Sequence, residues 1–339
     1  MSWDFQPAAL SFEPVRKDWD ALNQQAGGHI LLDAGFVAPL LRHFGGPHVL
    51  LGASKNSSES GLGLFIRKGH GLWETFQPAQ APIGLILLSR ADRTGEALSR
   101  ITHSLPGYAL QLSVLQQDPD HSCFAFRPRE HSLECLDYIQ TARITLQGTF
   151  EDYWKARGSN LRHNLARRRR RLIEKGYASE LIEIRSPAKV AAAIREYGLL
   201  ESQGWKGRDG TAIAEGNVQG RFYREIFEHF CERGEAVIFQ FLVNGQVAAS
   251  DLCLLRNGMM VVLKTAYDEQ FNDFSPAFLM REEILQRTFA EGRVNTIEFY
   301  GRVMEWHTRW SKEIRTLFHI NFFRNRWVAP LKRLAGRFA

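Results

Sequence analysis

Residues 235–280 read EAVIFQFLVNGQVAASDLCLLRNGMMVVLKTAYDEQFNDFSPAFLM, and this stretch decides the fold class. Two dipeptides, Asn244-Gly245 and Asn257-Gly258, separate three apolar runs that are rich in Val, Ile, Leu and Met. Asn-Gly readily adopts the positive φ angles that a two-residue type I′ turn demands. The stretch therefore predicts an antiparallel meander of three strands joined by two tight hairpins.

The segments after the meander predict a crossover. A helix over Pro276–Glu291 is followed by a strand over 294–300, a short helical segment over 303–313 and a last strand over 314–323. A strand, a helix and a second strand in this order form a βαβ unit with parallel strands. We therefore predict an α+β fold, in which a mixed, mostly antiparallel sheet is flanked by helices.

The first half of the chain also mixes strand-like runs with helices, which we predict over Gly35–His43 and Arg93–Ser104. This half shows no obvious cluster of reactive side chains. We expect an N-terminal domain over 1–145, a second domain over 146–325 and a basic C-terminal tail over 326–339.

The composition is that of a folded globular protein: 44% of the 339 residues are hydrophobic, and the formal net charge is +6. A positive balance suits an anionic ligand, an acidic polymer, nucleic acid or a membrane surface, and selects none of them. The longest apolar run, residues 83–88, is far shorter than the ~20 residues that span a bilayer. The N-terminus has no signal-peptide pattern, so we expect a cytoplasmic protein, with peripheral contact at the inner membrane as an alternative.

The four cysteines, Cys123, Cys135, Cys231 and Cys253, have neither CxxC spacing nor a nearby histidine pattern. Such spacing favours reduced thiols in the core over a disulfide or a zinc site. We therefore expect no metal in this protein.

Two charged residues fall inside the meander. If Asn257-Gly258 is a two-residue loop and pairing proceeds outward from it, Asp251 lies directly across from Lys264. By the same counting, Gln240 lies beside Ala249. We therefore expect a charged pair in the middle of the sheet. It is either a structural ion pair or part of an acceptor pocket, and both interpretations stay open.

The helix over 276–291 opens with Ser275-Pro276. Ser is a favourable N-cap residue and Pro a favourable first helical residue, so the dipeptide can simply be a good helix start. A helix start also presents unpaired N–H groups and a partial positive charge, which together suit a phosphate. Both readings fit the sequence.

Four blocks resemble one known family. They are residues 148–172, 201–213, 263–285 and 298–310, which read GTFEDYWKARGSNLRHNLARRRRRL, ESQGWKGRDGTAI, LKTAYDEQFNDFSPAFLMREEIL and EFYGRVMEWHTRW. Together they resemble the CelD-like, BioF2-type acetyltransferase family, which has the GNAT fold and is related to the FemAB peptidoglycan transferases. The first half of the chain is similar only to a degenerate GNAT-like lobe, which implies two tandem lobes. The sequence departs from the family at Ala277, where glycine is usual, and at His307, where lysine is common.

The resemblance implies an acyl-CoA-dependent N- or O-acyltransferase that acts on a sugar or on a cell-envelope or exopolysaccharide precursor. It places acyl-CoA along the third meander strand and at the following helix start, at Thr265, Ala266, Phe274, Ser275, Pro276 and Ala277. Residues that would contact an acceptor are Trp205, Lys206, Gln240, Asp268, Tyr300, His307 and Trp310. Trp205 could equally fill a core, and His307 and Trp310 fall at a helical spacing that is typical of packing.

Four side chains are candidates for the chemistry. Asp251 could orient the acceptor or take its proton, and Lys264 could polarise the acyl carbonyl or neutralise a phosphate. Tyr267 could protonate the leaving thiolate or merely end the sheet. Glu298 is a second candidate base, because it lies in a polar stripe on a strand that should be apolar.

The basic run Arg167–Arg171 and the C-terminal tail suggest contact with an anionic surface, a membrane or a carrier-bound phosphate. No zinc finger, helix-turn-helix or RNA-recognition signature supports nucleic acid binding. Two alternatives remain: a FemAB-like enzyme that uses aminoacyl-tRNA, and a non-catalytic accessory protein of polysaccharide biosynthesis.

Overall fold

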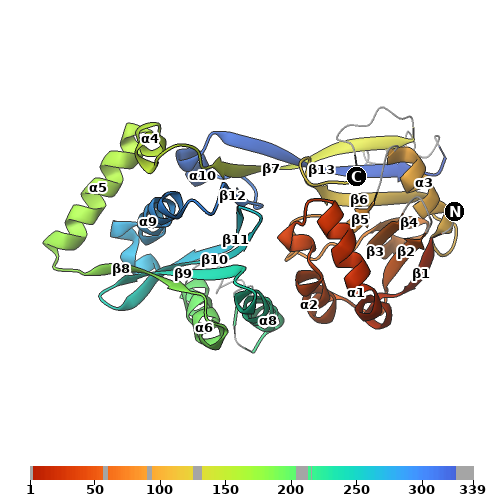
Figure 1. The fold of residues 1–339 in the computed structure, drawn as a ribbon, viewed down its shortest axis with the longest axis horizontal. Coiled ribbons are helices and arrows are strands. Elements are labelled where there is room, and N and C mark those ends of the chain that lie inside the picture. The colour runs from red at the N-terminus through yellow and green to blue at the C-terminus, as the bar shows by residue number, and fades with distance from the viewer. Residues whose placement is uncertain are drawn as a thin grey trace. The chain divides into compact units, whose positions relative to one another are not determined.

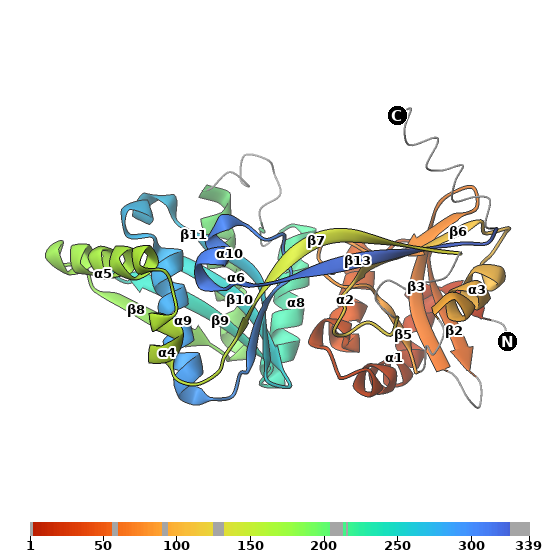
Figure 2. The ribbon, with the colours of Figure 1, turned by 90° about the horizontal axis from the view of Figure 1, so that it is seen from above.

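The computed structural model describes residues 3–55, 60–89, 94–124, 132–203, 213–214 and 216–325. The predictions for Trp205, Lys206 and the tail over 326–339 lie outside these residues. The chain divides into two compact units (Figures 1 and 2). Unit 1 comprises Met1–Gln140 and Thr316–Ala339, and unit 2 comprises Thr141–Arg315.

Unit 1 is built on one mixed sheet with the strand order β1-β2-β3-β4-β6-β13, and β5 pairs with β3. Strand β4 runs parallel to β6, and the other pairings within the unit are antiparallel. The elements are β1 (Asp4–Pro7), α1 (Ala8–Gln25), η1 (Ile30–Leu32), α2 (Ala34–Phe44), β2 (Val49–Lys55), β3 (Ser60–Gly69), β4 (Leu72–Thr75), β5 (Ile86–Leu88), α3 (Thr94–Ser104) and β6 (Gln111–Gln117). Two further strands, β7 (Leu133–Thr145) and β13 (Glu313–Phe323), contribute residues to both units.

Unit 2 has the strand order β7-β12-β11-β10-β9-β8. Its elements are α4 (Phe150–Lys155), α5 (Ser159–Glu174), β8 (Ser179–Ile184), α6 (Pro187–Gln203), α8 (Val218–Glu232), β9 (Ala236–Val243), β10 (Gln246–Arg256), β11 (Met259–Tyr267), η2 (Glu269–Phe274), α9 (Pro276–Glu291), β12 (Thr296–Phe299) and α10 (Glu305–Trp310). Helix α9 covers one face of the sheet, and α6 and α8 cover the other (Figure 1). Apolar side chains of β9, β10 and β11 pack against those of α9 in one buried cluster.

The predicted meander is confirmed. Asn244 and Gly245 have φ values of 50° and 76°, and Asn257 and Gly258 have 50° and 75°, as type I′ turns require. The predicted crossover is also present, since β11 and β12 are parallel and α9 connects them.

The predicted register is wrong in the middle of both hairpins. Asp251 pairs with Thr265, and Lys264 pairs with Leu252, because a β-bulge at Leu252/Cys253 leaves Leu263 as an extra residue in β11. A one-residue shift moves a side chain to the opposite face of a sheet, so Asp251 and Lys264 do not share a face.

A second irregularity lies between Val247 and Ala249, and it places Gln240 opposite Ser250 and not beside Ala249. Counting outward from a turn cannot detect either bulge, because no residue in these apolar strands marks its position.

Both units repeat one order of elements. In unit 1 the antiparallel strands β2, β3 and β4 are followed by β5, by helix α3 and by β6, which is parallel to β4. In unit 2 the antiparallel strands β9, β10 and β11 are followed by α9 and by β12, which is parallel to β11. The α+β prediction of two lobes, each with a mostly antiparallel mixed sheet, is confirmed.

The four cysteines are free thiols, and Cys231 and Cys253 are buried. Burial raises the pKa of Cys231 to about 11. Among the described helices, none combines the length and the apolar composition that crossing a bilayer requires.

Candidate active site

The start of α9 has a strained backbone. Ser275 has φ 47° and ψ 64°, a left-handed conformation, and it connects η2 directly to Pro276, the first residue of the helix. Such a conformation costs a non-glycine residue about 1–3 kcal/mol and concentrates at functional sites. Ser275 occupies the N-cap position as predicted, but its side chain makes no capping hydrogen bond. The simple helix-start reading therefore accounts for Pro276 and not for the serine hydroxyl.

A pocket of about 360 Å³ opens at this strained turn, and we call it the α9 pocket. It falls within the 300–1,000 Å³ range that is typical of small-molecule sites. Its walls come from the end of β11, from η2, from the start of α9 and from α10. The lining residues are Thr265, Tyr267, Asn272, Ser275, Pro276, Ala277, Phe278, Arg281, Trp306 and Trp310.

Behind two of these side chains lies a buried charge pair. Nη2 of Arg281 lies 2.6 Å from Oδ2 of Asp251, and Oγ1 of Thr265 donates to Oδ1 of the same carboxylate at 2.6 Å. The side chains of Asp251 and Arg281 are 0% and 2% exposed. Burial raises the pKa of Asp251 above its ordinary value, although Arg281 and Thr265 act in the opposite direction.

Arg281 connects this pair to the pocket. Its guanidinium carbon lies 5.0 Å from the centre of the Phe299 ring, which supports it from one side. Its buried Nη1 atom makes no hydrogen bond within the part of the chain that the structure describes. Arg281 lines the pocket, but Nη1 itself has almost no solvent-accessible surface, so it is a candidate to bind an anion or a carbonyl oxygen once the pocket wall moves slightly.

The predicted Asp251–Lys264 pair does not exist. Nζ of Lys264 lies 3.2 Å from Oε1 of Glu201 on α6, on the sheet face opposite α9. Glu201 also accepts from the Tyr197 hydroxyl at 3.4 Å and from the Ile213 N–H at 2.8 Å. Lys264 therefore belongs to a separate polar cluster under α6, because the bulge in β11 turns it away from Asp251.

Glu298 lies in a different setting from the one we expected. It is 0% exposed and lies 2.5 Å from Nε of Arg143 and 2.7 Å from Nη2 of Arg315. Tyr300 is buried beside it, with the Arg315 guanidinium 5.2 Å from its ring centre. Neither Glu298 nor Tyr300 lines the α9 pocket. A carboxylate that already neutralises two guanidinium groups is poorly placed to accept a proton.

His307 is buried on α10 and stacks on Trp306, with 3.5 Å between ring centres. Its Nδ1 atom accepts a hydrogen bond from the Met304 N–H at 2.9 Å, so the neutral ring carries its proton on Nε2. Burial lowers the pKa of His307 from 6.5 to about 4. The ring is therefore neutral near pH 7, and its neighbours Trp306 and Trp310 form one wall of the pocket.

The other predicted residues divide between the pocket and its surroundings. Tyr267 is 43% exposed and lines the pocket, whereas Asp268 caps η2 by accepting from the Gln270 N–H at 2.8 Å. Gln240 donates to Glu196 of α6 at 2.8 Å and faces away from α9. Ala266 and Phe274 are buried and do not line the pocket.

Sequence reasoning missed Arg281, the most informative residue of the site. A signal was present, since Phe278, Arg281, Ile284 and Leu285 share one helix face at spacings of three and four residues. A single arginine in that apolar stripe predicts a buried partner of opposite charge.

Comparisons with known proteins concern the fold that carries this site. Residues 159–308 match the model of a family described as an acetyltransferase (GNAT) domain. Unit 2, with its meander, crossover helix and pocket at the helix start, has the GNAT acyltransferase fold. No curated protein matches the chain in sequence.

Solved structures extend the likeness to both units. The structural alignment with FemX covers 93% of this chain and 98% of the FemX chain, with a TM-score of 0.57 and 11% sequence identity. L-PGS from Bacillus licheniformis gives a TM-score of 0.52 at 13% identity and covers 95% and 96% of the two chains. The C-terminal domain of a putative lysylphosphatidylglycerol synthetase from Agrobacterium fabrum gives 0.52 at 12% identity and covers 88% and 90%. At these identities the likeness shows the fold alone.

Proposed function

We propose that unit 2 transfers an acyl group from a coenzyme A thioester to an amine or hydroxyl of a sugar or cell-envelope precursor. The observation that carries this proposal is the α9 pocket. It joins the end of β11, a strained left-handed turn and the start of a long helix in one cavity. The family match over residues 159–308 and the resemblance noted in the sequence support the same chemistry.

The residues of the pocket fit an anionic donor. Pro276 has no N–H, and the Phe278 and Leu279 N–H groups donate to the Ser275 carbonyl oxygen, so the first turn of α9 offers a phosphate the Ala277 N–H and the positive end of the helix dipole. The dipole favours a phosphate by about 0.3–1 kcal/mol before direct hydrogen bonds are counted. Ala277 is small and half-buried at the second position of the helix, so a donor can approach the backbone closely. In this proposal Ser275, Pro276 and Ala277 hold the diphosphate.

The chemical step needs no covalent enzyme intermediate. The acceptor nitrogen or oxygen attacks the thioester carbonyl, the carbon–sulfur bond breaks, and the acceptor loses one proton while the thiolate gains one. In this proposal Nη1 of Arg281 stabilises the developing negative charge on the carbonyl oxygen, and Asp251 and Thr265 hold the arginine in place. Tyr267, at the rim of the pocket, is the candidate donor of a proton to the thiolate.

This assignment changes the role of Asp251. The carboxylate is buried behind Thr265 and Arg281, and both of its oxygens already have close partners. We therefore propose it as a positioning residue. Glu298 and Lys264 have structural roles in this proposal, because their ion pairs lie outside the pocket.

Two arginines near the pocket favour a donor that carries negative charge beyond the diphosphate group. Nη1 of Arg168 on α5 donates to the carbonyl oxygen of Asn272 at 3.4 Å, and Asn272 lines the pocket. The Arg309 guanidinium lies 5.8 Å from the ring centre of Phe278, another lining residue. Burial, followed by the charges of Arg167, Arg171 and Arg309, lowers the pKa of Arg168. Positive charge therefore gathers at the pocket, which suits a further phosphate of coenzyme A or the backbone of an aminoacyl-tRNA.

A thermal-shift titration with acetyl-CoA tests the proposal. The wild-type chain should gain melting temperature with ligand concentration. Ala277→Glu should abolish that gain, because it places a carboxylate in the proposed phosphate seat, while the helix dipole keeps the unliganded chain stable. Gln286→Glu is the matched control, since it makes the same charge change at an exposed position of α9.

The same assay separates the alternatives. A shift with aminoacyl-tRNA and none with acetyl-CoA would replace the coenzyme by the FemAB-type donor. If acetyl-CoA raised the melting temperatures of Ala277→Glu and wild type equally, the α9 pocket would not be the donor-binding site. A non-catalytic accessory protein would respond to neither donor.

A further inference from the structure

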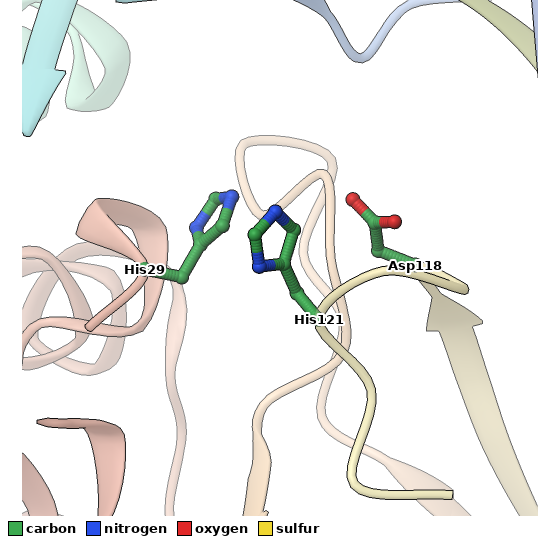
Figure 3. A group of neighbouring side chains, drawn as sticks. All are labelled: His29, Asp118 and His121. Atoms are coloured by element: carbon green, nitrogen blue, oxygen red, sulfur yellow. The ribbon is translucent and has the colours of Figure 1, made fainter. Parts of the chain in front are cut away.

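Unit 1 contains a cluster of side chains that could bind a metal ion, and no sequence motif predicts it. His29, Asp118 and His121 each offer one donor atom, and these three atoms all lie within 4.8 Å of one another (Figure 3). His29 immediately precedes η1, Asp118 follows the last residue of β6, and His121 lies in the turn after it. The expectation of no metal is based on the spacing of the four cysteines, and it does not consider these three residues, of which His29 is far from the other two in the chain.

The backbone around the cluster is well ordered by its own hydrogen bonds. The Asp120 N–H donates to Oδ1 of Asp118 at 3.0 Å. The His121 and Ser122 N–H groups donate to the Asp118 carbonyl oxygen at 3.1 and 2.8 Å. On the opposite side, Nδ2 of Asn23 donates to the His29 carbonyl oxygen at 3.0 Å. These bonds hold a carboxylate and two imidazoles in one place in the folded unit.

Burial makes the cluster different from a group of surface residues. His29 is 4% exposed and Asp118 is 2% exposed, whereas His121 is half-buried. The two histidine rings also lie close, with 4.7 Å between their centres. A site with two ligands inside and one at the rim can admit an ion from solvent and still hold it in a dry environment.

We propose that His29, Asp118 and His121 bind a divalent first-row transition metal, with Zn²⁺ as the test ion. Two neutral imidazoles and one carboxylate form a donor set that Zn²⁺ and Fe²⁺ bind in proteins. Metal–ligand bonds of ~2.0–2.2 Å require the three donors to close by small side-chain rotations. The half-buried side of His121 leaves a further position for water or a ligand.

Binding has a local cost at His29. The Leu31 N–H donates to Nδ1 of His29 at 3.2 Å, and the other ring nitrogen, Nε2, points toward His121 (Figure 3). Coordination through Nε2 leaves the ring proton on Nδ1, so the ring must give up this long hydrogen bond. The metal would then link the segment between α1 and α2 to the end of β6, two parts of unit 1 that are distant in sequence.

The experiment uses the intact, untagged chain after dialysis against a chelator. Zn²⁺ is titrated in competition with a chromophoric chelator, and Co²⁺ is added separately to record its visible absorption. The proposal predicts one saturable Zn²⁺ site, a rise in melting temperature with Zn²⁺, and a Co²⁺ spectrum of low-symmetry nitrogen and oxygen coordination.

Three variants locate the site. His121→Gln and Asp118→Asn should each weaken Zn²⁺ binding by at least about tenfold, since loss even of an outer-shell partner costs that much. His70→Gln, at an exposed position of the same unit, should bind like wild type. His121 is half-buried, so its variant should fold, and an unchanged far-ultraviolet circular dichroism spectrum checks this. No saturable binding by wild type, or equal binding by wild type and His121→Gln, overturns the proposal.

Discussion

Asp251 and Arg281 form a fully buried ion pair, 2.6 Å between Oδ2 and Nη2, that joins the middle of β10 to α9. The pair lies directly behind the pocket at the start of that helix, and Thr265 and Arg281 connect the two. A buried charge pair adds little net stability compared with well-packed apolar side chains. Its position at a cavity therefore points to a function that needs the arginine held in one orientation.

Breaking this pair should be costly. Asp251→Asn and Arg281→Met should each lower the free energy of unfolding by about 3–5 kcal/mol, because each leaves a buried partner without compensation. The double variant should lose much less than the sum of the two single losses, since neither charge then remains. Urea denaturation of the four proteins measures this. Additive losses would show that the two side chains do not interact.

His307 should make the protein sensitive to acid. Its pKa is about 4 in the folded chain and about 6.5 when unfolded, so the folded state favours the neutral ring. This contribution is fully present above pH 6.5, falls as pH drops toward 4, and amounts to at most about 3 kcal/mol. His307→Gln cannot take up the proton, so its stability should fall less between pH 7 and pH 4. If the free energy of unfolding depended on pH identically in wild type and His307→Gln, this prediction would be wrong. His163→Gln, at an exposed position, is the control.

The two Asn-Gly turns offer a matched test of backbone strain and close contact. Gly245 and Gly258 have nearly equal positive φ values, 76° and 75°. A Cβ at Gly245 would meet nothing within 4 Å, whereas one at Gly258 would lie 2.7 Å from Nδ2 of Asn295. Gly245→Ala should cost about 1–2 kcal/mol from φ alone, and Gly258→Ala should cost more. Thermal unfolding of both variants measures the difference, and equal losses would mean that Asn295 moves aside freely.

Lys264 should matter for stability and not for donor binding. Lys264→Met removes the cation that lies 3.2 Å from the buried Glu201 carboxylate, and because Lys264 is 18% exposed we expect a loss of about 1–3 kcal/mol. Acetyl-CoA should still raise the melting temperature of the variant as much as that of wild type, since the Lys264–Glu201 pair lies under α6. If the variant kept the stability of wild type but its melting temperature no longer rose with acetyl-CoA, Lys264 would have a role in donor binding.

Positive charge at the pocket should strengthen donor binding in a salt-dependent way. Arg168→Ala and Arg309→Ala should each weaken acetyl-CoA binding several-fold at low salt, and the difference from wild type should shrink as salt is added. Arg224→Ala is a suitable control, because Arg224 is an exposed arginine on α8, on the opposite face of the sheet. Calorimetric titration at two salt concentrations gives the comparison. Unchanged affinities would restrict the donor contact to the first turn of α9.

Much of the fold could be predicted because local signals decide it. Asn244-Gly245 and Asn257-Gly258 determine the hairpins, and the predicted helix over Pro276–Glu291 has the bounds that the structure gives to α9. The order strand, helix, parallel strand then follows from connection lengths. These features depend on neighbouring residues and so can be derived from sequence.

The candidate site was predicted less well, because tertiary packing decides it. Ser275 and Pro276 could be placed at a helix start, but the left-handed conformation of Ser275 could not be derived from its residue type. One β-bulge reversed the face of Lys264, and the partner of Asp251 came from a helix that begins beyond the meander. Such long-range choices leave no local pattern in the chain.

Unit 1 is completed only late in the chain, because β6 pairs with Phe318–Phe323 of β13. A fragment that stopped near residue 140 would therefore present a bare β6 edge, and exposed edges recruit strands from other molecules. During synthesis this unit must wait until all of unit 2 has been made. Attempts to express the N-terminal half alone should give aggregates, whereas a circular permutant that starts at Lys312, just before β13, and joins the old termini would place unit 1 in one continuous segment.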